Sequence, residues 1–472
     1  MTTSIVWVAA LALAACGGSG HDATVDAGTG GPQLAQVVVP VTPPTALDVL
    51  FVIDDSPSMA DQQANLAAAF ATFSEALQVL PGGMPDLHLG VVTTDLGTTG
   101  ALDATPGPAI GTAGMGGCAA NGKAGALRTG GAPITGAYLS DVAAAGGART
   151  TNYPADKTLA DMFALMAKAG DGGCGFEQPL EAMKQALLPT NAANQGFLRP
   201  SAALAVVFLT DEDDCSLAHA SLIAADATAL GALDSFRCTR FGVTCDTAGA
   251  TPDAMNTVGA KDGCHPTSDP TYLTSATDYA AFLQGLKPDP ARVAAAALMG
   301  TGTPFAVELK AVNGVPIPEL AASCKYLDDL GMSHAAYPPA RLAAFLGVLA
   351  KQGPTHGRAA SICSQDLSSG LADASEAMVA AMGDPCFHVR LLDTDAAADG
   401  IQATCTVTAD GGAAVPACSV DEPATNPPCY RIVNDGVSCG RSVELGSAKL
   451  ELEGADQLTG SAHVTARCQI AP

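Results

Sequence analysis

The chain has 472 residues, 48% of them hydrophobic, so it can build two or three folded domains and is not a mainly disordered protein. Its 22 basic residues stand against 47 acidic ones. The resulting net charge of −25 disfavours binding to a phosphate backbone, so nucleic acid is not an expected partner.

The chain opens with an apolar run over residues 5–15, which is too short to span a bilayer and suits the core of an export signal. It ends in Leu13-Ala14-Ala15-Cys16, which resembles the lipobox of bacterial lipoproteins. The resemblance implies a signal peptide over 1–16, a lipid on Cys16 and, because Gly17 follows, location at the outer membrane or cell surface. Residues 1–4 carry no Lys or Arg, unlike a typical export signal, and a soluble protein with an apolar N-terminal strand is the alternative.

Cysteine usage supports export independently. Fifteen Cys are present, and fourteen remain without Cys16, an even number that allows seven disulfides. No Cys-x-x-Cys pair occurs among them, which favours structural disulfides in an oxidising compartment over a zinc site. The short spacings suggest Cys238 with Cys245 and Cys429 with Cys439 as local pairs.

The first elements form a strand, loop and helix unit. Residues 17–45 are rich in Gly, Pro, Thr and Ala and are expected to form a flexible tether. Residues 47–53 (LDVLFVI) are a continuous apolar and β-branched run, typical of a strand buried on both faces. After a short loop, apolar residues at helical spacing from Leu66 to Leu80 predict a helix that ends at Pro81.

Further strands and helices alternate along the chain, which predicts an α/β fold with a doubly wound, mostly parallel, Rossmann-like sheet. Between them lie two insertions, near 97–155 and 215–275, which we expect to be surface loops pinned by disulfides. From residue 395 to 472 short alternating segments, turn residues and Cys predict a small β-type region. The additional predicted strands are 88–94, 204–210 and 293–299, and the additional helices are 177–188, 279–286, 341–349 and 371–382.

The most informative stretch is the loop that follows the first buried strand, Asp54-Asp55-Ser56-Pro57-Ser58. Ligands of α/β sheets bind beyond the carboxyl ends of the strands. A carboxylate and two hydroxyls at alternate positions can turn three oxygens toward one point, and oxygen is the ligand that Mg²⁺ prefers. The alternative is a purely structural role, in which Ser56 and Ser58 only cap the following helix.

Asp54-x-Ser56-x-Ser58 after VLFVI resembles the metal-ion-dependent adhesion site of von Willebrand factor A domains. The resemblance covers residues 46–394 and implies a von Willebrand factor A type sheet. It also implies a further acidic ligand after a later strand, and Asp211 in LAVVFLTD matches that position. The implied cofactor is Mg²⁺, with Mn²⁺ or Ca²⁺ as alternatives, and the implied partner is a protein that offers a carboxylate to the ion.

The chain departs from the family where a Thr is expected. The corresponding loop, residues 172–177 (GGCGFE), has no Thr, so either Glu177 replaces the hydroxyl or the coordination is incomplete. The acidic run Glu212-Asp213-Asp214 is read either as a second cation site, for instance for Ca²⁺, or as a solvated loop that starts a helix. Asp95 lies at another strand end and is expected to line the same rim.

These features predict a surface-anchored, divalent-cation-dependent protein-binding module that contacts the membrane only through its lipid. A structural envelope lipoprotein with a vestigial metal site is the alternative. A metal-dependent hydrolase is a third possibility, but neither a zinc-protease helix nor a nucleophile elbow is present, and residues 117–124 lack the Ser or Thr of a phosphate-binding loop. We therefore expect no enzymatic activity.

Overall fold

The computed structural model describes residues 33–471 with the exception of 79, 81–82, 145, 313, 329, 396, 398–400, 420–422, 437–438 and 440–445. The predicted signal peptide, its lipidation residue Cys16 and residues 17–32 of the predicted tether lie outside the described residues. None of the helices in the described part of the chain is both long and apolar enough to cross a bilayer.

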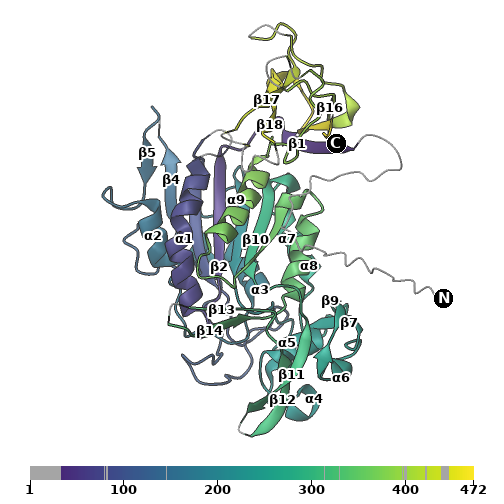
Figure 1. Cartoon of the computed structure of the whole chain (residues 1–472). Coiled ribbons are helices and arrows are strands. Elements are labelled where there is room, and N and C mark those ends of the chain that lie inside the picture. The colour runs from purple at the N-terminus through teal and green to yellow at the C-terminus, as the bar shows by residue number, and fades with distance from the viewer. Residues whose placement is uncertain are drawn as a thin grey trace, which may run out of the picture.

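A seven-stranded sheet forms the centre of the molecule, with the order β15-β10-β6-β2-β3-β4-β5 (Figure 1). The first five strands of this order run parallel, whereas β4 and β5 are antiparallel additions beside β3. The prediction of an α/β fold with a mostly parallel sheet is therefore confirmed. The strands are β2 (Ala46–Ile53), β3 (Asp86–Thr93), β4 (Leu139–Ala143), β5 (Arg149–Thr151), β6 (Ala203–Leu209), β10 (Val293–Met299) and β15 (Gly357–Ser361).

Helices cover both faces of the sheet because the strands are apolar on both sides. Successive side chains of a strand point to opposite faces. Val49 and Phe51 of β2 accordingly pack into one core, whereas Leu50 and Val52 pack into the other. The first core is closed by α1 (Ala60–Gln78), α2 (Leu159–Met166) and α9 (Ser368–Met382), and the second by α3 (Pro179–Leu187), α7 (Ala276–Gln284) and α8 (Ala340–Leu349).

The predicted insertions contain more regular structure than surface loops would have. Residues 97–155 include β4 and β5, which extend the central sheet, so the loop prediction is wrong there. Residues 215–275 form a subdomain with a β11–β12 hairpin (Figure 1). The elements within residues 215–275 are α4 (Ala227–Leu230), α5 (Phe236–Gly242), β7 (Val243–Thr247), α6 (Pro252–Met255), β8 (Gly259–Ala260) and β9 (Asp262–Pro266). The later strands are β11 (Ala306–Val312), β12 (Val315–Leu320), β13 (Cys324–Leu327) and β14 (Ser333–Ala336).

The C-terminal residues form a β module whose first strand comes from the other end of the chain. Strand β1 (Leu34–Pro40) pairs antiparallel with β19 (His463–Gln469), which also pairs with β16 (Cys405–Ala409). The predicted tether over 17–45 is therefore wrong for residues 34–40. Strands β17 (Cys429–Asn434) and β18 (Ala448–Glu453) form a second ladder, and short 3₁₀ turns are η1 (Ala192–Asn194), η2 (Ala220–Ile223), η3 (Pro290–Arg292), η4 (Pro354–His356), η5 (Asp410–Gly412) and η6 (Ala455–Gln457).

This module packs at the amino ends of the parallel strands (Figure 1). His463 of β19 lies 2.9 Å from Asp289, which comes four residues before β10 begins, and Arg292 donates to the carbonyl of Thr42 over 3.3 Å. The carboxyl ends of the parallel strands thus lie at the far side of the sheet from the module.

Seven disulfides join all fourteen Cys outside the predicted signal peptide, as the even count predicts. Both suggested local pairs are wrong, because Cys238 and Cys429 bond to the Cys before them in the sequence instead of the one after. The bonds are Cys118–Cys174, Cys215–Cys238, Cys245–Cys264, Cys324–Cys363, Cys386–Cys439, Cys405–Cys468 and Cys418–Cys429.

Candidate metal site

Three neighbouring strands end at the same level and bring the predicted site residues together. Ile53, the last residue of β2, pairs with Thr93 of β3 and with Leu209 of β6. The next residues, Asp54 and Thr210, therefore emerge side by side at the carboxyl edge of the sheet. This is the edge at which parallel sheets bind ligands.

Asp54 is fully buried, and its oxygens accept three hydrogen bonds. Its Oδ1 accepts from the backbone N–H of Ser56 over 2.8 Å, and its Oδ2 accepts from the hydroxyl of Thr210 over 2.8 Å. Its carbonyl accepts from the Gln63 amide on α1, also over 2.8 Å. The resulting turn places the hydroxyls of Ser56 and Ser58 3.1 Å apart, so two of the predicted ligand oxygens already face each other.

The Gly-containing loop 172–177 closes the other side of the site. The N–H of Gly173 donates to the Asp55 carbonyl over 2.7 Å, and the N–H of Gln178 donates to the Thr94 carbonyl over 3.1 Å. These bonds hold the loop against the residues that follow β2 and β3, and Glu177 has only 1% of its surface exposed. Asp211, directly after Thr210, is 2% exposed.

Four carboxyl groups in this region have raised pKa values. Burial raises the pKa of Asp54, raises those of Asp211 and Glu177 well above the ordinary range, and raises that of Glu212 to about 7. The negative charge of Asp54 raises the other three further. Among the described residues, no basic side chain is a leading influence on any of the four pKa values.

Some of the buried oxygens lack partners. Oδ1 of Asp211 and both carboxylate oxygens of Glu177 make no hydrogen bond of normal geometry within the described part of the chain. Ionising such a group in a dry interior is costly unless a cation or donors compensate the charge. The negative charge that these carboxyl groups carry when ionised and their oxygens without hydrogen bonds both favour a bound cation.

The other acidic residues of this rim have structural roles. Lys123 contacts the Asp55 carboxylate, and burial lowers the Lys123 pKa to about 8. Asp95 accepts from the N–H of Gly97 over 2.9 Å and so caps a turn.

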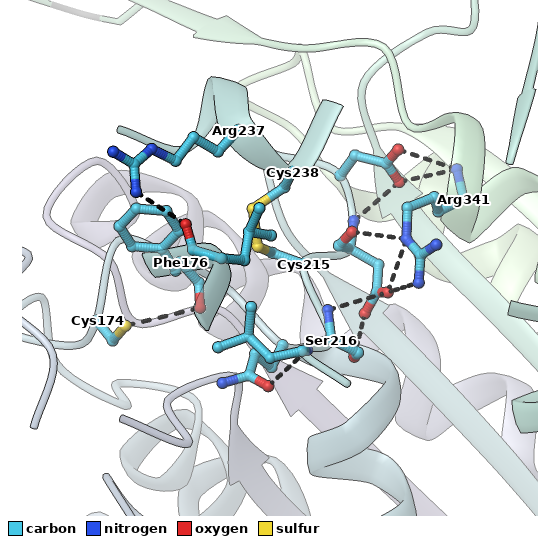
Figure 2. The surroundings of a disulfide bond; sticks show 12 residues. Cys174, Phe176, Cys215, Ser216, Arg237, Cys238 and Arg341 are labelled. Carbon is cyan, nitrogen blue, oxygen red and sulfur yellow. Dashed lines mark hydrogen bonds and ion pairs between the residues drawn. A yellow bond between two sulfur atoms is a disulfide. The ribbon is translucent and has the colours of Figure 1, made fainter. Parts of the chain in front are cut away.

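Asp213 and Asp214 bind Arg341, and the prediction of a solvated loop is wrong for Asp214, which is fully buried; the second cation site stays a prediction. Asp213 accepts from the backbone N–H of Arg341 over 2.9 Å, and Asp214 forms a 2.9 Å ion pair with its guanidinium. Figure 2 shows Arg341 among the residues that surround the Cys215–Cys238 disulfide. Arg341 is 1% exposed, so the charge of Asp214 is already compensated inside the protein.

Thr94 is a site residue that sequence reasoning missed. It follows β3, is fully buried, and lies close enough to Asp54 for its hydroxyl to lower the pKa of that carboxyl. The Thr94 hydroxyl has no hydrogen bond of normal geometry among the described residues. The sequence contains a signal for this residue, because Thr94 in VVTTDLG lies at the end of a predicted strand. From there its side chain can reach a ligand as readily as that of Asp95.

The spacing of the carboxylates limits how an ion could be held. Within the described residues, Asp54, Glu177 and Asp211 do not form a group whose ligand atoms all lie within 4.8 Å of one another. A single ion touching all three directly would require movement of the loops. Hydroxyl ligands with carboxylates acting through water fit the observed spacing, and Mg²⁺ usually keeps several of its waters.

No protein-family model matches the chain, and no curated protein matches it in sequence. Among solved structures, the human COPII-coat protein Sec24c is similar with a TM-score of 0.29 and 11% identity, over 93% of this chain and 41% of that one. The pilus adhesin RrgA from Streptococcus pneumoniae is similar with a TM-score of 0.22 and 11% identity, over 93% of this chain and 59% of the adhesin. The chain spans less than two thirds of the length of either protein.

Proposed function

We propose that this chain is a surface-anchored protein-binding module of the von Willebrand factor A type, in which a divalent cation presents an open position to a partner's carboxylate. Mg²⁺ is the preferred ion, with Mn²⁺ or Ca²⁺ as alternatives. The observation that carries the proposal is the pair of facing hydroxyls, Ser56 and Ser58, beside buried carboxylates that no basic group neutralises. Helices on both faces of the mostly parallel sheet agree with the doubly wound arrangement of that family.

In this proposal the Ser56 and Ser58 hydroxyls bind the ion directly, while Asp54 and Asp211 bind it through water. Both oxygens of Asp54 already accept hydrogen bonds, which suits an indirect role. Thr94 supplies the hydroxyl that the 172–177 loop lacks. Glu177 adds negative charge, and this weakens the attraction of the ion for a partner's carboxylate compared with a site that has a neutral hydroxyl there.

The position of the β module fits display on a surface. Strand β1 and the start of the described chain lie at the amino ends of the parallel strands, whereas the site lies at their carboxyl ends (Figure 1). A lipid on Cys16 would therefore tether the molecule by the end opposite the site. The outer membrane or cell surface is the proposed location, with the site directed away from the lipid.

The alternative is a structural envelope lipoprotein whose metal site is vestigial. The missing Thr of loop 172–177 and the wide spacing of the carboxylates favour it. We propose no enzymatic role, since a metal-dependent hydrolase would need a catalytic base directed at substrate beside the ion. The two non-enzymatic functions differ in one measurable property, the affinity for Mg²⁺.

Isothermal titration calorimetry of the purified full chain with Mg²⁺ and Mn²⁺ tests the proposal. We expect saturable binding of Mg²⁺ in the wild type, loss of it in Asp54→Ala and a clear weakening in Ser58→Ala, whose exposed side chain makes a folding defect less of a concern. Asp253→Ala, which alters an acidic side chain that is 94% exposed, is the matched control and should leave the affinity unchanged. Mg²⁺ binding that is absent from the wild type, or equal in all four proteins, would support the vestigial site instead.

A second variant pair tests the role of Thr94. Thr94→Val keeps the shape of the side chain and removes its hydroxyl, so we expect weaker Mg²⁺ binding at unchanged thermal stability. Thr93→Val is the control, because the preceding side chain on a strand points to the opposite face. Equal Mg²⁺ affinities of the two variants would remove Thr94 from the site.

A further inference from the structure

A second group of side chains that could bind a metal ion lies at the same edge of the sheet. It consists of Asp61 in the first turn of α1, and Asp328 and His334 in and beside the β13–β14 hairpin. One ligand atom from each lies within 4.8 Å of the other two. These residues come from segments more than 260 positions apart in the sequence, and only the fold brings them together.

The distances within this group match a coordination sphere. Nε2 of His334 lies 3.0 Å from Oδ2 of Asp61 and 3.1 Å from Oδ2 of Asp328. Metal–ligand bonds of about 2.1 Å place neighbouring ligands of an octahedron roughly 3 Å apart. Ion pairing explains the group less well, because Nε2 carries at most one hydrogen and cannot donate fully to two carboxylates at once.

The surroundings orient the three ligands. Oδ1 of Asp328 accepts from the backbone N–H groups of Leu330 and Met332, which leaves its Oδ2 to face the group. The Tyr326 ring stacks on the His334 imidazole, with ring centroids 5.0 Å apart and planes at 20°. Hydrogen bonds of the kind that Asp328 accepts are typical of metal-ligating carboxylates, because they fix the ligand's orientation before the ion arrives.

Solvent can reach one side of the group. The Asp61 side chain is 46% exposed, whereas those of Asp328 and His334 are 14% and 15% exposed. A bound ion would thus have three protein ligands and positions open to water. One imidazole nitrogen and two carboxylate oxygens favour a first-row transition metal over Mg²⁺, which prefers oxygen alone.

We propose that Asp61, Asp328 and His334 form a second cation site that binds a transition metal such as Zn²⁺, Co²⁺ or Mn²⁺ and ties the β13–β14 hairpin to α1. This site is separate from the Ser56 and Ser58 hydroxyls and does not depend on the function proposed above. An ion here would hold the hairpin at the edge of the sheet where the first site opens.

Titration of the full chain with Co²⁺, followed by calorimetry and by the visible absorption of the bound ion, tests this site. We expect Co²⁺ binding in the wild type and in Asp54→Ala, and binding at least roughly tenfold weaker in His334→Ala. Asp61→Asn alters a half-exposed side chain, so it keeps the test valid if His334→Ala fails to fold, and it should also weaken binding.

The control is His265→Ala. The His265 side chain is 57% exposed, and its imidazole lies 3.8 Å from the Asp246 carboxylate, so this variant also removes an imidazole near a carboxylate. It should bind Co²⁺ as the wild type does. Equal Co²⁺ affinity in the wild type, His334→Ala and Asp61→Asn would overturn the proposal, as would an equal loss in His265→Ala. Loss of Co²⁺ binding in Asp54→Ala alone would assign the ion to the first site instead.

Discussion

Two buried aspartates at opposite ends of strand β2 show how local partners decide the role of a carboxylate. Asp48 lies near the start of the strand, where it pairs with Arg199 at 2.8 Å and with Lys287 at 3.7 Å. Asp54 follows the end of the strand, where hydrogen bonds alone compensate its charge. Burial raises the pKa of both, but only Asp48 has cations of the protein beside it. The charge at Asp54 is therefore the one that an external ion can compensate.

Asp48→Asn should destabilise the fold without affecting the metal site. The substitution leaves Lys287, whose side chain is completely buried, without its carboxylate. Removing one partner of a buried ion pair costs about 3–5 kcal/mol. Urea unfolding followed by circular dichroism measures the loss, and Asp253→Asn at an exposed ion pair should change stability by less than about 1 kcal/mol. A cost for Asp48→Asn as small as that of the control would contradict this account of Asp48.

Asp234 provides a pH-dependent prediction. Burial raises its pKa from 3.8 to about 6, despite Arg237 nearby. The folded protein therefore holds the proton more tightly than the unfolded chain, so this group's stabilising contribution is present below pH 4 and is lost as pH rises through 6. Relative to Asp234→Asn, which cannot ionise, the wild type should lose stability between pH 4 and 6. Parallel stability curves for the two proteins over that range, from thermal unfolding, would rule out the raised pKa.

At the scale of single elements, the loop that carries Glu177 depends on a glycine. A Cβ on Gly173 would lie 2.4 Å from Oδ1 of Asp55 and 2.7 Å from its carbonyl oxygen, distances that real Cβ atoms do not show. The loop can therefore pack against Asp55 only because residue 173 has no side chain.

Gly173→Ala should push this loop outward, weaken Mg²⁺ binding and destabilise the protein by about 1–3 kcal/mol, as overpacking does. Gly175→Ala is the matched control, since a Cβ there meets its nearest atom at 3.5 Å, an ordinary contact. Calorimetry and thermal unfolding of both variants check the prediction. If Gly173→Ala kept wild-type affinity and stability, Glu177 would not depend on this contact.

Elements with a local signal were predictable from the sequence, and those that depend on distant partners were not. The strand at 47–53 and the acidic residues after it stood out because a continuous β-branched run ends there. Thr94 was missed because a hydroxyl at a strand end is a weaker signal than the carboxylate of Asp95 that follows it. His334 was missed as a ligand because its neighbours Asp61 and Asp328 meet it only in the folded chain.

At the scale of the whole molecule, the long-range pairings could not be predicted. Residues 34–40 belong to a strand whose partner, His463–Gln469, lies at the opposite end of the chain, so their Gly- and Pro-rich surroundings suggested a tether. The disulfides illustrate the same limit, since the even number of Cys predicted seven bonds but spacing did not predict the pairs. The fold nevertheless separates the two ends of the sheet, with the β module at one and both candidate cation sites at the other (Figure 1).

The central claim is that a divalent cation binds between the Ser56 and Ser58 hydroxyls at the carboxyl edge of the sheet. The most direct measurement is anomalous X-ray scattering from crystals of the full chain soaked in Mn²⁺, compared with crystals of Asp54→Ala. The account predicts an anomalous peak within bonding distance of both hydroxyls in the wild type, bridged by water to Asp54 and Asp211, and no peak at that position in the variant. A wild-type map with no peak beside Ser56 and Ser58, in crystals that bind Mn²⁺ elsewhere, would contradict it.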